Sequence, residues 1–587
     1  MASTLISPSA LLISPTLKKK QPFSFASKRV VFCRANNGFD RRDMLLGLGS
    51  LYGATSLVGD PFALASPIAP DFSRPCSDAI LPGNHVPCCP PESTKIIDFE
   101  LPEVRKIRHR PAAHLVDCDY LIKFELAMER MRALPKDDPR SFFQQARVHC
   151  AYCNEAYFQK EPPRDEPDQK LKVHFSWLFF PFHRMYLYFY EKILGELIGE
   201  PDFAMPFWNW DSPCGMTMPG IYLDPASPLY DPNRNVEHQH VLVDLSDGKK
   251  SKTKSTERGT TYELSRTGQI KNNLNVMYNE MVSGSKKATW FYGQKYRAGC
   301  NSKDDGQCKP EPGGGLVENG SHIAIHKFVG AKKPPYNEDM GNFYSAGRDP
   351  LFYAHHGNVD RMWSIRKALP GWRQEFHYRV DRDWYNSEFY FYDEKRNLVR
   401  AKVWQFLDTE RLGYAYQNVD IPWLRSRPTP RRLRGGQGKA KVAETIDIRN
   451  AFPLVLDNLV RIKVPRPKRS MTKPVEGYKD EDEDEEVLVI QNIQVDRNAS
   501  VKFDVNINDL DDETPARPED SEFAGSFSTI PHGIDHPDSK INTSLTLPIS
   551  ELLKDLGIED EDYIEVSLVP KEGKGLVSIG NIKIDKC

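Results

Sequence analysis

The stretch 349–363, DPLFYAHHGNVDRMW, predicts a helix that carries two adjacent histidines. Asp349 followed by Pro350 is typical of a helix start, because the carboxylate caps free amides and proline fits the first helical turn. Neighbouring residues on a helix point about 100° apart, a little over a quarter-turn. His355 and His356 therefore face different surroundings, and we expect only one of them to face a functional partner.

His356 shares its helix face with Phe352, Asp360 and Trp363. A carboxylate one turn beyond a histidine is how a metal-binding imidazole and the acceptor that orients it are arranged in proteins. We therefore take His356 as a candidate metal ligand and Asp360 as its acceptor. His355 is left in a supporting role.

The composition limits the classes of protein to which this chain can belong. Its 587 residues exceed one ordinary domain, so two or more domains and processing segments are expected. The 79 Lys and Arg nearly balance the 81 Asp and Glu, which gives no reason to expect nucleic acid or an anionic membrane as a partner. A hydrophobic fraction of 39% suits a globular enzyme.

Two targeting signals are predicted in front of the folded part. Residues 1–38 are rich in Ser, Lys and Arg and contain no acidic residue, as in an organelle transit peptide; a disordered N-terminus is the alternative. Residues 39–65 combine Arg41-Arg42, a short apolar run and an Ala-Leu-Ala site, which is typical of a twin-arginine export signal. The run is too short for a transmembrane anchor. Together the signals predict the chloroplast thylakoid lumen and a mature chain that begins near Ser66.

A second helix is predicted from Asp138 and Pro139, again an N-cap acceptor followed by proline. His149 and Cys153 fall on one face of this helix. The pair offers an imidazole and a thiol to the same side.

Two histidines further on have a spacing that restricts their structure. His174 and His183 are nine residues apart, two and a half helical turns, and would point in opposite directions on one helix. Pro181 and Gly199 mark the ends of a predicted helix. If both histidines serve one site, His174 lies in a loop and His183 lies in the first turns of that helix.

The stretch 231–320 is polar, rich in glycine and poor in periodic signals, so we assign it mostly to loops. Cys300 and Cys308 flank a small hydrophilic loop and could form a local disulfide. Immediately afterwards, HIAIH places His322 and His326 one turn apart on a short predicted helix.

Six histidines thus form two groups of three: His149, His174 and His183, then His322, His326 and His356. Imidazole binds copper, zinc, iron and nickel. HIAIH lacks the glutamate that zinc proteases place between the two histidines, and neither group carries the obvious carboxylate that non-haem iron oxygenases use. Coordination by histidine alone at two sites favours copper.

The C-terminal part changes character. A basic stretch rich in Pro and Gly, RSRPTPRRLRGGQGKAK, predicts an exposed linker at 425–445. Beyond it, short β-branched segments such as EVLVIQNIQV and SVKFDVNIND predict a β-sandwich over residues 446–587. Residues 66–424 remain for the domain that carries the histidines.

The motifs of the chain resemble those of plant polyphenol oxidases (catechol oxidases and tyrosinases) of the type-3 copper family, over essentially the whole length. The matching motifs are HCAYC (149–153), FFPFHRMYLYFYE (179–191), FWNWD (207–211), HIAIH (322–326), GRDPLFYAHHGNVDRMW (347–363), DRDW (381–384), YAY (414–416) and KFDV (502–505). The resemblance implies a mainly α catalytic domain, a four-helix bundle with long loops around a dicopper site, and a C-terminal β-sandwich that shields it.

The resemblance also implies roles for individual residues. It assigns the first copper to His149, His174 and His183, and the second copper to His322, His326 and His356. It implies a thioether between Cys153 and His174, and the disulfides Cys76–Cys89 and Cys88–Cys150. It assigns no role to Cys118, Cys214 and Cys587.

Four residues are implied at the substrate pocket: Phe343, Ile323, Lys327 and Glu318. Phe343 matches the gate over the second copper, and Glu318 matches an acid that holds a water near it. Family members that hydroxylate monophenols well often have Asn where this chain has Ile323, which can neither hold a water nor accept a proton. Ile323 therefore favours diphenol oxidation. Lys327 is a cation that could meet acidic substrates.

The expected function is copper-dependent oxidation of o-diphenols to o-quinones, with reduction of O2 to water, by a latent proenzyme that a protease activates. A tyrosinase-type or metabolite-specific monophenol hydroxylase is the alternative on the same site. An O2-binding type-3 copper protein without catalysis is less expected, because the plastid address and single-chain architecture speak against a carrier. The expected partners are O2 and small phenols.

Overall fold

The structure is a computed structural model of the chain. It describes residues 66–81, 84–162, 166–250, 266–298, 313–331, 337–369, 381–431, 444–467, 485–511, 515–532 and 540–586. Both predicted targeting signals, most of the predicted linker and the cysteines Cys300, Cys308 and Cys587 lie outside these residues. No helix in the described ranges has the length and apolar character needed to cross a bilayer.

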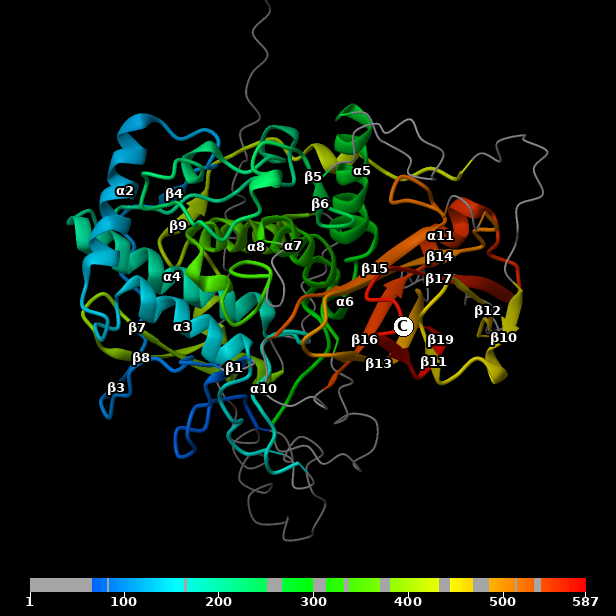
Figure 1. The fold of residues 1–587 in the computed structure, drawn as a ribbon, viewed down its shortest axis with the longest axis horizontal. Helices are drawn as coiled ribbons and strands as arrows, with labels where there is room; N and C mark the ends of the chain where they lie inside the picture. Colours follow the sequence, from blue (N-terminus) through cyan, green and yellow to red (C-terminus); the bar gives the residue numbers. More distant parts are fainter. Residues whose placement is uncertain are drawn as a thin grey trace, which may run out of the picture. The chain divides into compact units, whose positions relative to one another are not determined.

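A helical domain holds a large aromatic core. Its helices are α2 (Cys118–Ala133), α3 (Phe142–Cys153), α4 (Phe179–Ile198), α5 (Arg266–Tyr278), α6 (Ala288–Tyr292), α7 (Ile323–Val329), α8 (Pro350–Ala368) and α10 (Arg382–Asn386). Figure 1 shows α3, α4, α7 and α8 gathered in one helical region. The core beneath them includes the fully buried Trp177, Trp208, Trp210 and Trp363. This packing holds the helices that carry the histidines.

Helix α4 is buried on most of its faces, which explains its very apolar sequence. Pro181 lies in its first turn, and Gly199 ends it in the left-handed conformation at φ +69°. Both ends agree with the prediction. His183 lies in the first turns, whereas His174 lies in the preceding loop, which is the arrangement that the nine-residue spacing requires.

Helix α8 begins where the sequence predicts. Asp349 is its N-cap and accepts a hydrogen bond from the Leu351 amide at 2.8 Å. The same carboxylate forms a buried ion pair with Arg234 at 2.5 Å. A cap that is also an ion-pair partner fixes the direction in which this helix enters the core.

Helix α3 begins later than predicted. Its N-cap is Ser141, whose hydroxyl accepts from the Gln144 amide at 3.3 Å. Asp138, the predicted cap, instead forms an ion pair with Arg140 at 2.8 Å. The prediction of a start at Asp138 was wrong because a nearby guanidinium competes for the carboxylate.

The assignment of 231–320 mostly to loops missed helical structure between residues 266 and 292. Helix α5 spans 13 residues there, and a π-helix at Asn279–Ser283 and α6 follow it. Four of the six buried residues of α5 are Asn or Gln, so apolar periodicity marks this helix only weakly. Asn273, for example, accepts from the Leu245 amide at 3.0 Å and donates to the Val243 carbonyl at 2.8 Å.

Short strands tie distant segments of the helical domain together. They are β1 (Ala79–Leu81), β2 (Asn84–Val86), β3 (Ile96–Asp98), β4 (Arg108–Arg110), β5 (Val243–Asp244), β6 (Lys249–Lys250), β7 (Glu388–Tyr392), β8 (Leu398–Lys402) and β9 (Tyr414–Tyr416). β4 pairs in parallel with β9, and β8 joins β3 to β7. The disulfides Cys76–Cys89 and Cys88–Cys150, the pairs that the resemblance implies, connect the N-terminal arm within itself and to α3.

The C-terminal domain is a β-sandwich. One five-stranded sheet has the order β10 (Thr445–Asp447), β12 (Val460–Pro465), β17 (Tyr563–Glu572), β14 (Val501–Ile507) and β15 (Phe523–Thr529). The other contains β11 (Leu454–Val455), β18 (Val577–Ile579), β13 (Glu486–Asp496), β16 (Lys540–Pro548) and β19 (Asn581–Lys586), with α11 (Ser550–Leu556) nearby in sequence. Alternating Val, Ile, Leu and Phe from both sheets form its core. The predicted fold class is confirmed.

Candidate metal centre

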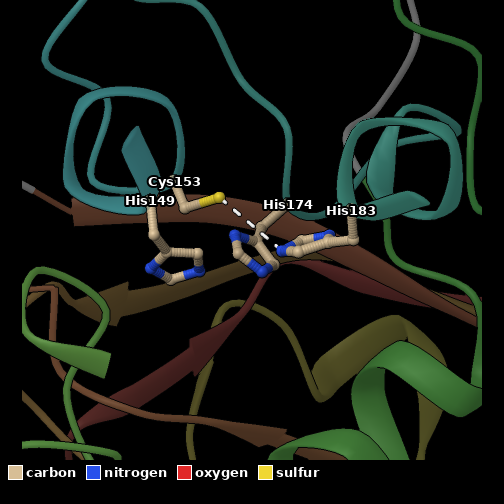
Figure 2. A group of neighbouring side chains, drawn as sticks. All are labelled: His149, Cys153, His174 and His183. Carbon is tan, nitrogen blue, oxygen red and sulfur yellow. Dashed lines mark hydrogen bonds between the residues drawn. The ribbon is translucent and has the colours of Figure 1, made fainter. Parts of the chain in front are cut away.

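The first group of ligands comes from three segments. His149 and Cys153 lie on α3, His174 lies in the loop before α4, and His183 lies on α4. Figure 2 shows these side chains turned toward a common space. All four are buried, and one ligand atom from each lies within 4.8 Å of the others. Three imidazoles at this separation can share one ion.

The second group comes from the π-helix Glu318–His322, from α7 and from α8. His322, His326, His355 and His356 are buried and also offer ligand atoms within 4.8 Å of one another. The rings of His183 and His356 stack with centroids 4.1 Å apart, so the two groups are adjacent. The chain therefore presents two neighbouring histidine sets, which suits a pair of metal ions.

Backbone carbonyls orient four of the imidazoles. The Nδ1 atoms of His149, His183, His322 and His326 lie 2.9, 2.7, 3.1 and 2.7 Å from the carbonyl oxygens of Phe343, Phe179, Glu318 and Met340. A carbonyl can only accept, so Nδ1 of each ring carries the proton and Nε2 keeps its lone pair. Within the part of the chain that the structure describes, the Nε2 atoms of His149 and His322 are buried and have no hydrogen-bond partner. A buried imidazole nitrogen that has a free lone pair and no hydrogen-bond donor is suited to bind a metal ion.

Hydrogen bonding distinguishes His356 from its neighbour. The Trp210 indole donates to His355 Nδ1 at 3.2 Å, and an indole N–H can only donate. Neutral His355 therefore carries its proton on Nε2 and cannot bind a metal through that atom. His356 Nε2 lies 3.4 Å from His326 Nε2. Two nitrogens bound to one tetrahedral ion at about 2.0–2.1 Å lie about 3.3 Å apart, so the separation of these two Nε2 atoms fits a shared metal ion.

Burial keeps these histidines neutral. Loss of water contact lowers the pKa of His183 to about 3 and that of His326 to about 4. The same cause lowers the pKa of His149, His174, His322, His355 and His356 well below the ordinary value. Neutral imidazole is the form that binds a metal. The rings are therefore ready to coordinate without losing a proton.

Cys153 is buried beside the first group. Its sulfur lies 3.8 Å from His183 Nε2, and it forms no disulfide with any cysteine in the described part of the chain. Burial raises the pKa of this thiol well above its ordinary value. The thioether to His174 stays a prediction. The sulfur of Cys153 and a ring nitrogen of His174 lie within 4.8 Å of each other, which is compatible with such a bond.

The C-terminal domain lies directly on the predicted gate. The Phe343 ring is fully buried, with its centroid 4.4 Å from that of His174 and 4.3 Å from that of His532. The Phe343 amide donates to the Pro531 carbonyl at 3.0 Å. Ile530 completes a small apolar cluster with Phe343 and Ile323. Nothing in the local sequence marks the segment 530–532 as part of the site, and the sequence prediction missed it.

Glu318 is buried at the start of the π-helix that ends at His322. One carboxylate oxygen accepts from the Phe175 amide at 2.7 Å, and the other is buried with no side-chain hydrogen bond to a described residue. Burial raises the pKa of Glu318 well above its ordinary value. Phe175 follows His174 and has a left-handed backbone, φ +56°. Glu318 therefore holds the loop that positions His174.

Comparisons with known proteins cover nearly the whole chain. Residues 139–369 match the common central domain of tyrosinase, 379–429 the polyphenol oxidase middle domain, and 452–586 the chloroplastic polyphenol oxidase C-terminal domain. A chloroplastic polyphenol oxidase of Malus domestica is 49% identical over 97% of this chain and 94% of its own length. The chain belongs to the polyphenol oxidase family.

Other members of the polyphenol oxidase family differ in their named activities. A (+)-larreatricin hydroxylase of Larrea tridentata is 44% identical over 99% of both chains. The structure of latent apple tyrosinase is similar with a TM-score of 0.73 and 49% identity, covering 84% of this chain and all of that one. An active aurone synthase, described with copper B, has a TM-score of 0.52 and 41% identity over 60% of this chain and all of that one.

In this polyphenol oxidase, Asp360 does not contact His356, contrary to the prediction. Asp360 accepts from Arg184 Nε at 2.5 Å and from the Tyr414 hydroxyl at 2.7 Å, and it also contacts Arg110 and Tyr416. His356 Nδ1 has no partner among the described residues. Two buried guanidiniums outcompete a neutral imidazole for the carboxylate, because charge-assisted hydrogen bonds are about twice as strong as neutral ones.

The Asp360 cluster joins α8 to α4 and to the β4–β9 pair. Burial alone would raise the pKa of Asp360, but Arg184 and Arg110 hold it below its ordinary value. Arg110 also forms an ion pair with Glu191 at 2.8 Å, with both side chains fully buried. The cluster holds the two helices that supply His183 and His356.

Replacing Asp360 by Asn should destabilise the protein by about 3–5 kcal/mol, because two buried guanidiniums lose their shared counter-charge. Glu103→Gln is the matched control, since the Glu103–Arg105 pair is exposed and is worth at most about 1 kcal/mol. Thermal and urea unfolding of the full-length chains measure the difference. Equal unfolding midpoints in the two variants would contradict the role given to Asp360.

Exchanging each adjacent histidine for Gln should separate their roles. His356→Gln should reduce bound copper from about two ions per chain to about one, because a site of three ligands loses one of them. His355→Gln should retain about two, because its Nε2 carries a proton and does not coordinate. Copper per chain is measured by atomic absorption after reconstitution. Equal losses in both variants would show that the tautomer argument is wrong.

Proposed function

We propose that this chain is a copper-dependent oxidase that converts o-diphenols to o-quinones while O2 is reduced to water. The observation that carries the proposal is the pair of adjacent, buried, neutral histidine sets whose candidate ligand atoms lie within 4.8 Å of one another in each set. Two diphenols supply the four electrons and four protons that turn one O2 into two waters. The proposed ligands are His149, His174 and His183, then His322, His326 and His356.

Copper is the ion that this donor set fits best. Every proposed ligand is an imidazole, and the sets contain no carboxylate of the kind that hard ions prefer. When bound, a copper pair supplies reversible one-electron redox chemistry at each ion, which two-electron reduction and oxidation of small molecules require. The protein contributes the fixed ring orientations and a dry, enclosed site.

The residues around the histidines shape what can react there. Ile323 and Phe343 form an apolar wall that accepts an aromatic ring and excludes bulk water. The unpartnered oxygen of Glu318 can hold a water at the edge of this wall. Ile323 itself offers no polar atom that could deprotonate a monophenol. This arrangement favours diphenols, which bring two ionisable hydroxyls of their own.

Monophenol hydroxylation is the second candidate, because relatives include a named hydroxylase and a named tyrosinase. We expect the wild-type chain to oxidise dopamine at least about tenfold faster than it hydroxylates tyramine, since the Ile323 side chain can neither accept a proton nor hold a water. Ile323→Asn should raise the tyramine-to-dopamine rate ratio. Oxygen consumption and quinone absorbance follow both reactions at known copper content. A steady tyramine rate close to the dopamine rate would favour the hydroxylase.

The proposed enzyme is latent as synthesised. The proposed domains are a catalytic domain at 66–424, a linker at 425–445 and a shielding β-sandwich at 446–587. The segment Ile530–His532 covers Phe343, and a relative of known structure is described as latent. Cleavage of the basic linker would allow the β-sandwich, with its segment 530–532, to dissociate from the catalytic domain.

Limited trypsin treatment should raise dopamine oxidation about tenfold or more without changing copper content, because a covered site cannot take part in catalysis until it is exposed. The control is Ile530→Ala in the uncut chain, which thins the cover and should give a smaller rise. Activity, copper content and gel mobility are measured along the digestion. Turnover that stays constant while the linker is cut would exclude latency.

We also propose that the chain resides in the chloroplast thylakoid lumen, with a transit peptide at 1–38 and a twin-arginine signal at 39–65. The relatives named chloroplastic support the plastid. Lys-Lys in place of Arg41-Arg42 should leave uptake into isolated chloroplasts intact but block entry into thylakoids, since twin-arginine export reads the pair. Protease protection of thylakoid fractions reports the outcome. Unchanged entry would refute the second signal.

A further inference from the structure

The turn that carries His322 is the π-helix Glu318–His322, and a side chain from another helix enters it. The Ser321 amide donates to the Oε1 atom of Glu280 at 2.9 Å, and the Ser321 hydroxyl lies 2.5 Å from Glu280 Oε2. Glu280 belongs to the π-helix that follows α5 and is buried. A side chain that takes an amide out of the main-chain hydrogen-bond ladder bends or widens a helix at that point. The Glu280 carboxyl group therefore shapes the turn immediately before a proposed ligand.

Gly320 lets this carboxyl group approach the backbone closely. Its φ of −103° and ψ of −106° interrupt the helical geometry inside the turn. A Cβ atom at this position would collide with Glu280 Oε1, so the contact requires a residue without a side chain. At the start of the same turn, the Glu318 carbonyl lies 3.1 Å from His322 Nδ1. One short turn therefore receives the Glu280 carboxyl group and orients the His322 ring.

Glu280 is also tied to the helix that carries His356. The Ser285 hydroxyl donates to the Glu280 carbonyl, and the Ser285 carbonyl accepts from Arg366 Nε at 2.7 Å. Arg366 lies on α8, the same helix as His356. A path of hydrogen bonds thus runs from α8 through Glu280 to the residue before His322. This path holds two of the three proposed ligands of the second group relative to each other.

We propose that Glu280 is a positioning residue of the second metal group, and that its carboxyl group sets the π-helical turn that directs His322 toward the other ligands. The inference rests on the proposed role of His322 as a ligand. Burial raises the pKa of Glu280 to about 8 against the opposing effect of the Ser321 hydrogen bonds, so the group is mostly protonated at neutral pH. A protonated carboxyl group offers one donor and one acceptor to Ser321, and glutamine offers the same pair. Glu280→Gln should therefore preserve the turn, whereas Glu280→Met should release it.

Copper binding by the full-length, metal-free chain tests this role. Copper(I) is titrated in competition with a chromophoric chelator, which gives the affinity for each of the two ions. The second ion should bind about tenfold more weakly in Glu280→Met, as when a group that orients a metal ligand is lost, and with parent affinity in Glu280→Gln. Ser321→Ala keeps Glu280 and removes only the hydroxyl contact, so it should weaken the second ion about threefold. Parent affinity in both Glu280→Met and Ser321→Ala would overturn the proposal.

Asn273→Leu is the matched control for a loss of stability alone. Asn273 is buried on α5 and hydrogen-bonds the Leu245 amide and the Val243 carbonyl instead of the turn before His322. The substitution should lower the midpoint of urea unfolding, as Glu280→Met does, but leave the affinity for both ions unchanged. An equal loss of the second ion in Asn273→Leu would show that general destabilisation weakens the site, and would overturn the proposal.

The ring nitrogens of His322 give a readout that needs no metal. In the metal-free parent, His322 Nδ1 carries the proton because it faces the Glu318 carbonyl, and nitrogen chemical shifts of histidine-labelled protein report this tautomer. The tautomer should persist in Glu280→Gln and Asn273→Leu and become mixed in Glu280→Met. A chain with this pattern but no diphenol oxidation would refute the proposed function and support the role of Glu280. An active chain whose tautomer and second-ion affinity are unchanged in Glu280→Met would refute the role of Glu280 alone.

Discussion

The hydrogen bonds between imidazole Nδ1 atoms and backbone carbonyls are the interaction on which the metal centre depends. They fix the tautomer of four rings and therefore decide which nitrogen remains free to bind. Two of the acceptors, Met340 and Phe343, belong to one loop, which orients His326 in one group and His149 in the other. Because one loop holds a ligand of each group, the spacing of the two sites is set by backbone geometry.

The same loop connects the centre to the C-terminal domain. The Phe343 carbonyl bonds to His149 while its amide bonds to Pro531, so a single residue contacts both a proposed ligand and the cover. Burial under this cover also contributes to the low pKa of the histidines, which keeps them neutral. The covering segment, the gate residue Phe343 and the carbonyl that orients His149 are therefore directly connected. The ion pair between Lys327 and Glu572 adds a charged contact between the two domains.

Asp360 shows where reasoning along a single helix fails. Helical spacing correctly placed Asp360 one turn from His356. However, Arg110 on β4 and Arg184 on α4 donate hydrogen bonds to the Asp360 carboxylate, so it does not orient His356. Ser141 replaced Asp138 as a cap for a related reason, since a local guanidinium competes for the acid. In both cases a charged partner prevailed over a pattern that considers one element at a time.

The sequence by itself determined the elements whose signals are local: the start of α8 at Asp349, the ends of α4, the loop position of His174, both histidine groups and the β-sandwich. These follow from capping, periodicity and spacing, which neighbouring residues control. Tertiary structure alone decided the amide-lined burial of α5, the tautomer of His355 through Trp210, the partners of Asp360 and the placement of 530–532 over Phe343. Each of these features depends on contacts between residues far apart in the chain, and no local sequence pattern predicts such contacts.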